Sequence, residues 1–216
     1  MARESIRTGD GLDLEGAWDL PEGEPEGVVV LCHPHPLMHG SMDAPLIRGI
    51  AGRLAGAGFA VLRFNFRGVG RSEGGWGGGT AEIEDVAAAI EHAEAALPGL
   101  PHVLAGWSFG AHTGLRWQAR ADDARPFAGI APPISLTGDS DLPAPVALPP
   151  ADRLFIIGDR DQFTTAADLE AYAAAAGARC EVLAGSDHFF AFRDSQVADL
   201  LIGHFSQAEE LGGVLP

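Results

Sequence analysis

Lysine is absent from this sequence of 216 residues, so all 14 of its basic residues are arginine. A P-loop needs a lysine on the phosphates of its nucleotide, and Schiff-base or pyridoxal-phosphate chemistry needs a lysine amine. The absence of lysine therefore excludes all of these reaction classes.

Cysteine and long hydrophobic runs are also scarce. The two cysteines, Cys32 and Cys180, each lie in an apolar run typical of a strand, so we expect buried free thiols and no disulfide framework. The first residues lack an apolar stretch of signal-peptide length, and no window of about 18 residues is uninterruptedly apolar. We expect a cytoplasmic protein that does not associate with membranes.

Positive charge is scarce. The 14 basic residues stand against 30 acidic residues, which gives a net charge of -16. Such a charge repels nucleic acids and anionic lipids, so neither is an expected partner. The length fits a single domain over residues 1–216.

Apolar strand-like runs alternate with helical patterns along most of the chain. Gly9-Asp10-Gly11 separates runs at residues 4–8 and 12–18, which indicates an opening antiparallel hairpin. The alternation that follows predicts an α/β fold with a mostly parallel central sheet and helices on both faces. The expected strands are residues 27–33, 59–64, 102–107, 127–131, 153–157 and 179–183, and the expected helices are residues 43–57, one capped by Thr80, 109–120, 165–176 and 194–205.

The strongest chemical signal is Gly106-Trp107-Ser108-Phe109-Gly110, between a predicted strand and a predicted helix. A sharp strand-to-helix turn of this type projects a serine oxygen above the sheet, at a helix N-terminus that favours developing negative charge. We therefore predict Ser108 as a nucleophile.

A serine nucleophile needs a histidine base, which a carboxylate in turn orients. His188 follows the last predicted strand and is the expected base, whereas His112 and His204 lie within predicted helices. Asp161 follows the penultimate strand and is the expected acid, with Asp159 as the alternative. Asp187 is too close to His188 in sequence to orient it and is expected to brace the loop.

The oxyanion hole is expected to use two backbone amides. One belongs to Phe109, the residue after the nucleophile, and the other to the loop His33-Pro34-His35-Pro36-Leu37. Because proline has no N–H, His35 is the natural second donor.

Two further motifs resemble a metal site and a cofactor site, but each departs from the full pattern. His33, His35 and His39 have neither the helical spacing nor the acidic ligands of a catalytic zinc site, so a loop role is preferred. Gly68-Val69-Gly70 begins like a dinucleotide fingerprint, but Glu73 occupies the place of the third glycine. We expect neither a metal nor a cofactor.

Four motifs resemble those of small bacterial α/β-hydrolases related to the dienelactone hydrolases and to the serine aminopeptidase and X-prolyl peptidase branch. They are His33-Pro34-His35-Pro36, residues 63–72, residues 106–111 and Asp187-His188-Phe189-Phe190. The resemblance spans residues 12–206 and implies Ser108, Asp161 and His188 as a catalytic triad, with the His35 and Phe109 amides as the oxyanion hole. A serine nucleophile distinguishes the chain from the dienelactone hydrolases proper, which use cysteine.

Residues 132–152, where this fold commonly carries a lid, are few and proline-rich. We therefore predict no lid domain and an open cleft, with Leu37, Trp107, Phe163 and Phe189 as apolar walls. Trp76 either lines the cleft or anchors its glycine-rich loop at the surface. The predicted function is a carboxylesterase for small or short-chain esters that works through an acyl-enzyme. The expected partner is therefore a small-molecule ester, and a homodimer is left open because edge strands of such domains often pair. The alternatives are a small peptidase or amidase with the same triad and a catalytically silent binding protein.

Overall fold

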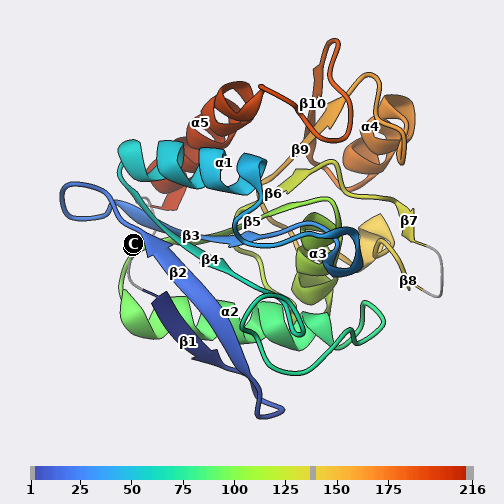
Figure 1. The fold of residues 1–216 in the computed structure, drawn as a ribbon. Coiled ribbons are helices and arrows are strands. Elements are labelled where there is room, and N and C mark those ends of the chain that lie inside the picture. The colour runs from blue at the N-terminus through green and yellow to red at the C-terminus, as the bar shows by residue number, and fades with distance from the viewer. Residues whose placement is uncertain (1–2, 137–139, 213–216) are drawn as a thin grey trace.

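An eight-stranded, mostly parallel sheet organises the computed structural model, which describes residues 3–136 and 140–212 (Figure 1). The strand order is β1-β2-β4-β3-β5-β6-β9-β10, and only the β1–β2 and β2–β4 pairs are antiparallel. The strands are β1 (Arg3–Arg7), β2 (Asp13–Asp19), β3 (Gly27–Cys32), β4 (Phe59–Phe64), β5 (His102–Trp107), β6 (Phe127–Ile130), β9 (Arg153–Gly158) and β10 (Arg179–Leu183).

The pairing and burial of these strands follow from the local sequence. The predicted hairpin forms, and the Thr8 amide donates to the Leu12 carbonyl at 2.9 Å across the turn. Every residue of β3 is buried, as its continuous apolar run requires in a central parallel strand. Cys32 pairs with Phe64 and with Gly106, so β3, β4 and β5 end at the same edge of the sheet.

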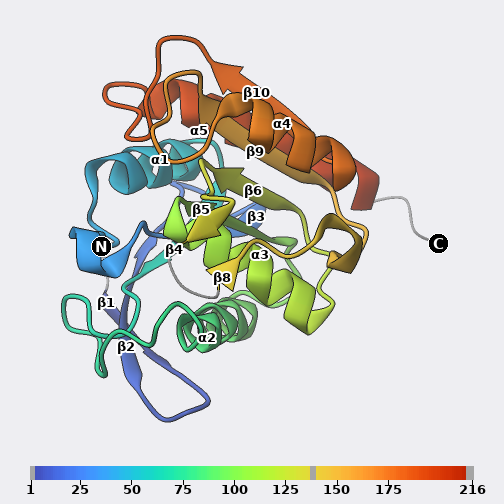
Figure 2. The same cartoon turned by 90° about the vertical axis from the view of Figure 1, so that its right-hand side faces the viewer.

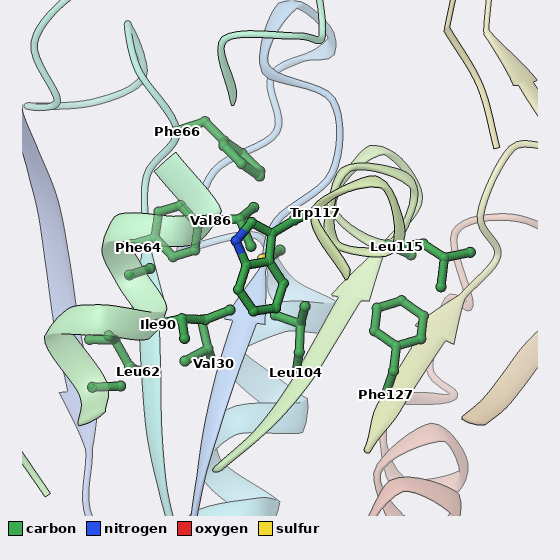
Figure 3. Close-up of a cluster of buried hydrophobic side chains, with 14 of the residues drawn as sticks. Val30, Leu62, Phe64, Phe66, Val86, Ile90, Leu104, Leu115, Trp117 and Phe127 are labelled. Atoms are coloured by element: carbon green, nitrogen blue, oxygen red, sulfur yellow. The ribbon is translucent and has the colours of Figure 1, made fainter. Parts of the chain in front are cut away.

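Helices cover both faces of the sheet, as predicted. The pair α1 (Pro45–Gly56) and α5 (Asp194–Gly212) lies side by side on one face (Figures 1 and 2). The opposite face carries α2 (Glu82–Ala96), α3 (Phe109–Ala121) and α4 (Ala166–Ala175). The core beneath these three helices is aromatic-rich, with Trp117 of α3 among Val86, Ile90 and Leu104 (Figure 3).

One predicted helix start is wrong. The N-cap of α2 is Ala81 rather than Thr80, and no side chain caps it. The preceding loop is instead fastened by the first residue of the helix, because Glu82 accepts a hydrogen bond from the Gly77 amide at 2.6 Å. By contrast, α4 ends as predicted, with Gly177 in the left-handed region at φ 64°.

The segment between β6 and β9 is short. Its described part contains β7 (Ser135–Leu136), β8 (Ser140–Asp141) and a turn of 3₁₀ helix at Pro145–Ala147. The part of this segment that the structure describes holds no helical cap, in agreement with the prediction of a fold without a lid. Over residues 3–136 and 140–212, no helix is both long enough and apolar enough to cross a bilayer.

Candidate active site

Ser108 lies in the tight turn between β5 and α3, where the chain must pass very close to its neighbours. Its backbone has φ 54° and ψ -118°, a strained conformation that points to a functional position. A Cβ atom at Gly110 would lie 2.5 Å from the Cys32 carbonyl oxygen, and one at Gly106 would collide with the Gly110 backbone. Both glycines of the motif are therefore required by close packing.

A continuous hydrogen-bond chain joins Ser108, His188 and Asp161. The Ser108 hydroxyl donates to Nε2 of His188 at 2.8 Å, and Nδ1–H of His188 donates to Oδ2 of Asp161 at 2.8 Å. This tautomer is assigned because the carboxylate can only accept. The structure thus brings together three residues that are separated by up to 80 positions in the sequence.

The Asp161 side chain is fully buried, and hydrogen bonds compensate for the burial of its charge. Its second oxygen, Oδ1, accepts hydrogen bonds from the Phe163 amide at 2.8 Å and the Thr164 amide at 3.1 Å. Burial raises the pKa of this carboxyl group, but the hydrogen bonds from His188 and from the two amides outweigh it and hold the pKa below its ordinary value. Asp161 is therefore an anion at neutral pH, able to orient an imidazole.

The loop that carries His188 is held from several sides. The His188 carbonyl accepts a hydrogen bond from Trp107 Nε1 at 3.1 Å, and the His188 amide donates one to Gln162 Oε1 at 3.2 Å. Asp187 braces the loop as expected, by accepting from the Phe189 amide at 3.0 Å. The alternative acid, Asp159, is turned to the Gly185 amide at 2.7 Å. It is therefore Asp161, and not Asp159, that contacts the imidazole.

Two backbone amides next to Ser108 are candidates for binding an oxyanion. Phe109 is the first residue of α3, where an amide has no intrahelical acceptor. His35 precedes a 3₁₀ turn (Pro36–Met38), and within the described chain neither its amide nor that of Phe109 takes part in a protein hydrogen bond. Both residues line the same cavity as Ser108.

The loop of His35 is shaped by two residues whose role the sequence analysis missed. His33 is fully buried, and it accepts from the Phe66 amide at 3.0 Å through Nε2 while Nδ1–H donates to the Pro34 carbonyl at 2.6 Å. The amide of Gly40 closes the loop onto the His35 carbonyl at 3.0 Å, and a Cβ atom there would collide with the Pro34 carbonyl. The sequence signal that could have indicated this role of Gly40 is a glycine shortly after the histidine-proline loop.

His33 is therefore unsuited to a metal, since both of its ring nitrogens are occupied within the protein. Burial, the largest cause, lowers the pKa of His33 to about 4, so the ring is neutral at physiological pH. In the described part of the chain, no three His, Cys, Asp or Glu residues are grouped so as to hold a metal ion.

The segment that resembles a dinucleotide fingerprint has a structural explanation. Asn65 accepts from the Met42 amide at 2.8 Å and donates to Glu15 at 2.9 Å. Gly70, at φ 59°, packs directly on the Asn65 side chain, so a Cβ atom there would collide with it. This glycine leaves room for an asparagine rather than for a phosphate.

A cavity of about 510 Å³ opens beside Ser108 and His188. Three of the four predicted wall residues line it, namely Trp107, Phe163 and Phe189. Trp76, for which a surface anchor was the alternative, lines it as well. The prediction for Leu37 is wrong, because this side chain lies outside the lining of the cavity. The 3₁₀ turn presents the next residue, Met38, to the cavity instead. The lining residues that the sequence analysis missed are Met38, His39, Gly40, Ala44, Pro45, Gly78, Gly79, Pro133 and Ser135.

Two other histidines, His112 and His204, follow Ser108 in the sequence and are bonded elsewhere. His112, one turn beyond Ser108, is fully buried and its Nδ1–H donates to the Pro133 carbonyl at 2.9 Å. His204 is buried against the Phe127 carbonyl at 3.1 Å. Neither is bonded to Ser108, which leaves His188 as its imidazole partner.

The fold and the geometry around Ser108 define an α/β serine hydrolase. Comparison with known families then gives a particular assignment, because the model of the serine aminopeptidase S33 family matches residues 23–155, more than half of the chain. The chain belongs to this family.

Two solved structures and one further protein are similar to this chain over most of its length. An α/β serine hydrolase without a lid from Xanthomonas campestris is 29% identical, with a TM-score of 0.83 over 95% of this chain and 94% of that one. An α/β serine hydrolase homologue from Coxiella burnetii is also 29% identical, with a TM-score of 0.81 over 93% and 95% of the two chains. An uncharacterised protein of Rickettsia prowazekii (strain Madrid E) is 29% identical over 197 residues, which cover 82% of each chain.

Proposed function

We propose that this hydrolase is a carboxylesterase that cleaves small, uncharged esters through an acyl-enzyme formed on Ser108. The observation that carries the proposal is the hydrogen-bond chain from Asp161 through His188 to Ser108, with 2.8 Å at both links. A serine hydroxyl becomes an effective nucleophile when a base lies within hydrogen-bond reach and a carboxylate orients that base.

The first half of the reaction forms the acyl-enzyme. His188 Nε2 takes the Ser108 proton while Oγ attacks the acyl carbon, and Asp161 stabilises the imidazolium that results. The amides of His35 and Phe109 stabilise the negative charge on the former carbonyl oxygen. The tetrahedral intermediate then collapses, the bond to the alkoxy oxygen breaks, and His188 returns its proton to the departing alcohol.

The second half releases the acid. A water molecule gives a proton to His188 as its oxygen attacks the acyl carbon, and the intermediate expels Ser108, which recovers its proton from the imidazole. Each group ends in its starting state, so the cycle needs no cofactor.

The lining of the cavity supports an uncharged substrate. None of the described residues that line it is aspartate or glutamate, and aromatic, proline and methionine side chains predominate. A peptidase that recognises a free N-terminus needs an acidic group to pair with the ammonium ion, and an unpaired cation would be desolvated here at a large cost. The lining therefore favours esters over aminoacyl substrates, although the triad could also act on amides.

Fluorophosphonate labelling and ester turnover test the proposal together. The wild type should be labelled at Ser108 and should hydrolyse para-nitrophenyl acetate and butyrate, whereas Ser108→Ala should lose both properties. Ser5→Ala, an exposed substitution on β1, is the matched control and should retain them. A well-folded wild type that is neither labelled nor active would refute the serine mechanism and favour a binding protein.

Aminoacyl anilides distinguish the two enzyme hypotheses. We expect their turnover to be at least a hundredfold below that of para-nitrophenyl butyrate in kcat/KM. Comparable values would replace the esterase with a peptidase or amidase while leaving the triad intact.

A further inference from the structure

Trp76 packs against both residues whose amides form the proposed oxyanion hole. Its ring centroid lies 4.7 Å from that of His35 and 5.3 Å from that of Phe109, and these two rings are themselves 5.0 Å apart. The three rings thus form a closed triangle that joins the His35 loop to the start of α3. Tilted contacts of this kind are specific in geometry as well as apolar.

The segment that presents Trp76 has no stiffness of its own. Five of the six residues 74–79 are glycine, and Gly74, Gly78 and Gly79 have positive φ. Glycine samples many conformations, so such a segment cannot hold an indole ring in one place by local preference. Something outside the segment has to fix it.

Two side chains fasten this segment at either side of Gly78. The Gly77 amide donates to Glu82 Oε1 at 2.6 Å, and Arg116 Nη1 donates to the Gly79 carbonyl at 2.6 Å. Glu82 begins α2 and Arg116 lies on α3, so the segment is tied to two helices of the rigid core.

Glu82 is unusual because its side chain is fully buried. Its Oε2 atom has no hydrogen-bond partner among the described residues, and its field acts on both Arg116 and His35. Burial of an acidic group is costly unless the group is paired or hydrogen-bonded, so a buried glutamate points to a role that an apolar side chain could not fill. A fixed acceptor for the Gly77 amide is such a role.

We propose that Trp76 is a positioning residue for the oxyanion hole and that Glu82 holds it in place. The inference rests on the proposed esterase function and adds a role to that site. Oxyanion donors act mainly on the transition state, and removal of one donor costs about 10²- to 10³-fold in kcat. A donor that is displaced rather than lost should cost less, about 10- to 100-fold.

The alternative is that Trp76 is only an apolar wall of the cavity. A wall contributes to ground-state binding, so its loss would raise KM, and more for a longer acyl chain. A misplaced oxyanion donor would lower kcat to the same extent for every ester, because each one develops the same oxyanion. The ratio of the effects on kcat and KM therefore separates the two roles.

The experiment compares Trp76→Ala, Trp76→Phe, Glu82→Ala and Glu84→Ala on para-nitrophenyl acetate and butyrate. Glu84 lies in the same turn of α2 and pairs with Arg120 at the surface, which makes its substitution a matched control. We expect Trp76→Ala and Glu82→Ala to lower kcat about 10- to 100-fold on both esters with KM changed less than threefold. Trp76→Phe, which keeps an aromatic ring, should recover part of the kcat that Trp76→Ala loses, and Glu84→Ala should stay within threefold of the wild type.

Inhibition by an alkylboronic acid gives an independent measurement, since its adduct with Ser108 resembles the tetrahedral intermediate. In the variants its inhibition constant should rise in proportion to the loss of kcat/KM. A rise in KM that grows from acetate to butyrate would overturn the proposal in favour of a wall, and an equal loss in Glu84→Ala would overturn the role of Glu82. Failure of the esterase hypothesis would be visible separately, as an inactive wild type. If Trp76→Ala does not fold, Glu82→Ala carries the test.

Discussion

Two buried histidines make the stability of the fold sensitive to mild acid. His33 and His112 are fully buried, and burial, the largest cause, lowers the pKa of each from 6.5 to about 4. In the unfolded chain both rings titrate near 6.5. Between about pH 6.5 and 4 the unfolded state therefore binds protons that the folded state does not, so stability falls as the pH falls. At about 1.4 kcal/mol per pH unit, each histidine accounts for about 3 kcal/mol across this range.

The assay is urea unfolding, followed by circular dichroism, at several pH values between 4.5 and 7.5. His112→Leu removes one titrating ring, so the dependence of unfolding free energy on pH should become shallower by about 1.4 kcal/mol per pH unit. Thr113→Val, at the adjacent buried position, removes a hydroxyl that has no partner in the described chain and should leave this dependence unchanged.

An equal pH dependence in the wild type and in His112→Leu would refute the reasoning, because it would mean that His112 binds no extra proton on unfolding. The absolute stability of the variant at neutral pH is not the test, since the lost hydrogen bond to Pro133 changes it as well. Protonation of His33 should also affect the active site. A protonated Nε2 can no longer accept the hydrogen bond from the Phe66 amide. Acid should therefore increase the mobility of the His35 loop before the protein unfolds.

Three further predictions concern the site. Asp161→Asn should lower kcat on para-nitrophenyl acetate about 10⁴-fold with little change in KM, because an amide favours the wrong histidine tautomer, and a loss below tenfold would contradict its orienting role. Gly110→Ala should destabilise the folded protein by several kcal/mol, because the added Cβ atom collides with the Cys32 carbonyl. Gly52→Ala, in open space on α1, should stabilise it by about 0.5–1 kcal/mol. Thermal unfolding measures both effects. Phe189→Ala should raise KM for para-nitrophenyl butyrate about fivefold, because the substrate loses about 1 kcal/mol of apolar contact. An equal effect of Leu37→Ala would contradict the structure, in which Leu37 does not line the cavity.

The geometry around Ser108 was predictable because order along the chain translates directly into position at a parallel sheet. Ser108, Asp161 and His188 follow β5, β9 and β10, whose carboxyl ends lie at one edge. A strand-to-helix pentapeptide and two loop positions were therefore enough to indicate which side chains meet.

Features that depend on the path of a single turn were not predictable in this way. Leu37 and Met38 are adjacent apolar residues, and only the 3₁₀ geometry decides which of them faces the cavity. Thr80 has the chemistry of a helix cap, but α2 starts two residues later at Glu82. The burial of Glu82 itself was hidden because an acidic residue in a first helical turn ordinarily indicates an exposed, dipole-stabilising position.

The half-exposed rims of the cavity bear on what happens to an acyl group once Ser108 carries it. Phe163 and Phe189 are 53% and 50% exposed, so the bound acyl carbon would stay within reach of any small nucleophile in the surrounding solution. In the proposed mechanism, added alcohols would then compete with water for the acyl group on Ser108. Under the proposed mechanism we therefore expect methanol or glycerol to divert part of the acyl groups from acid to new ester.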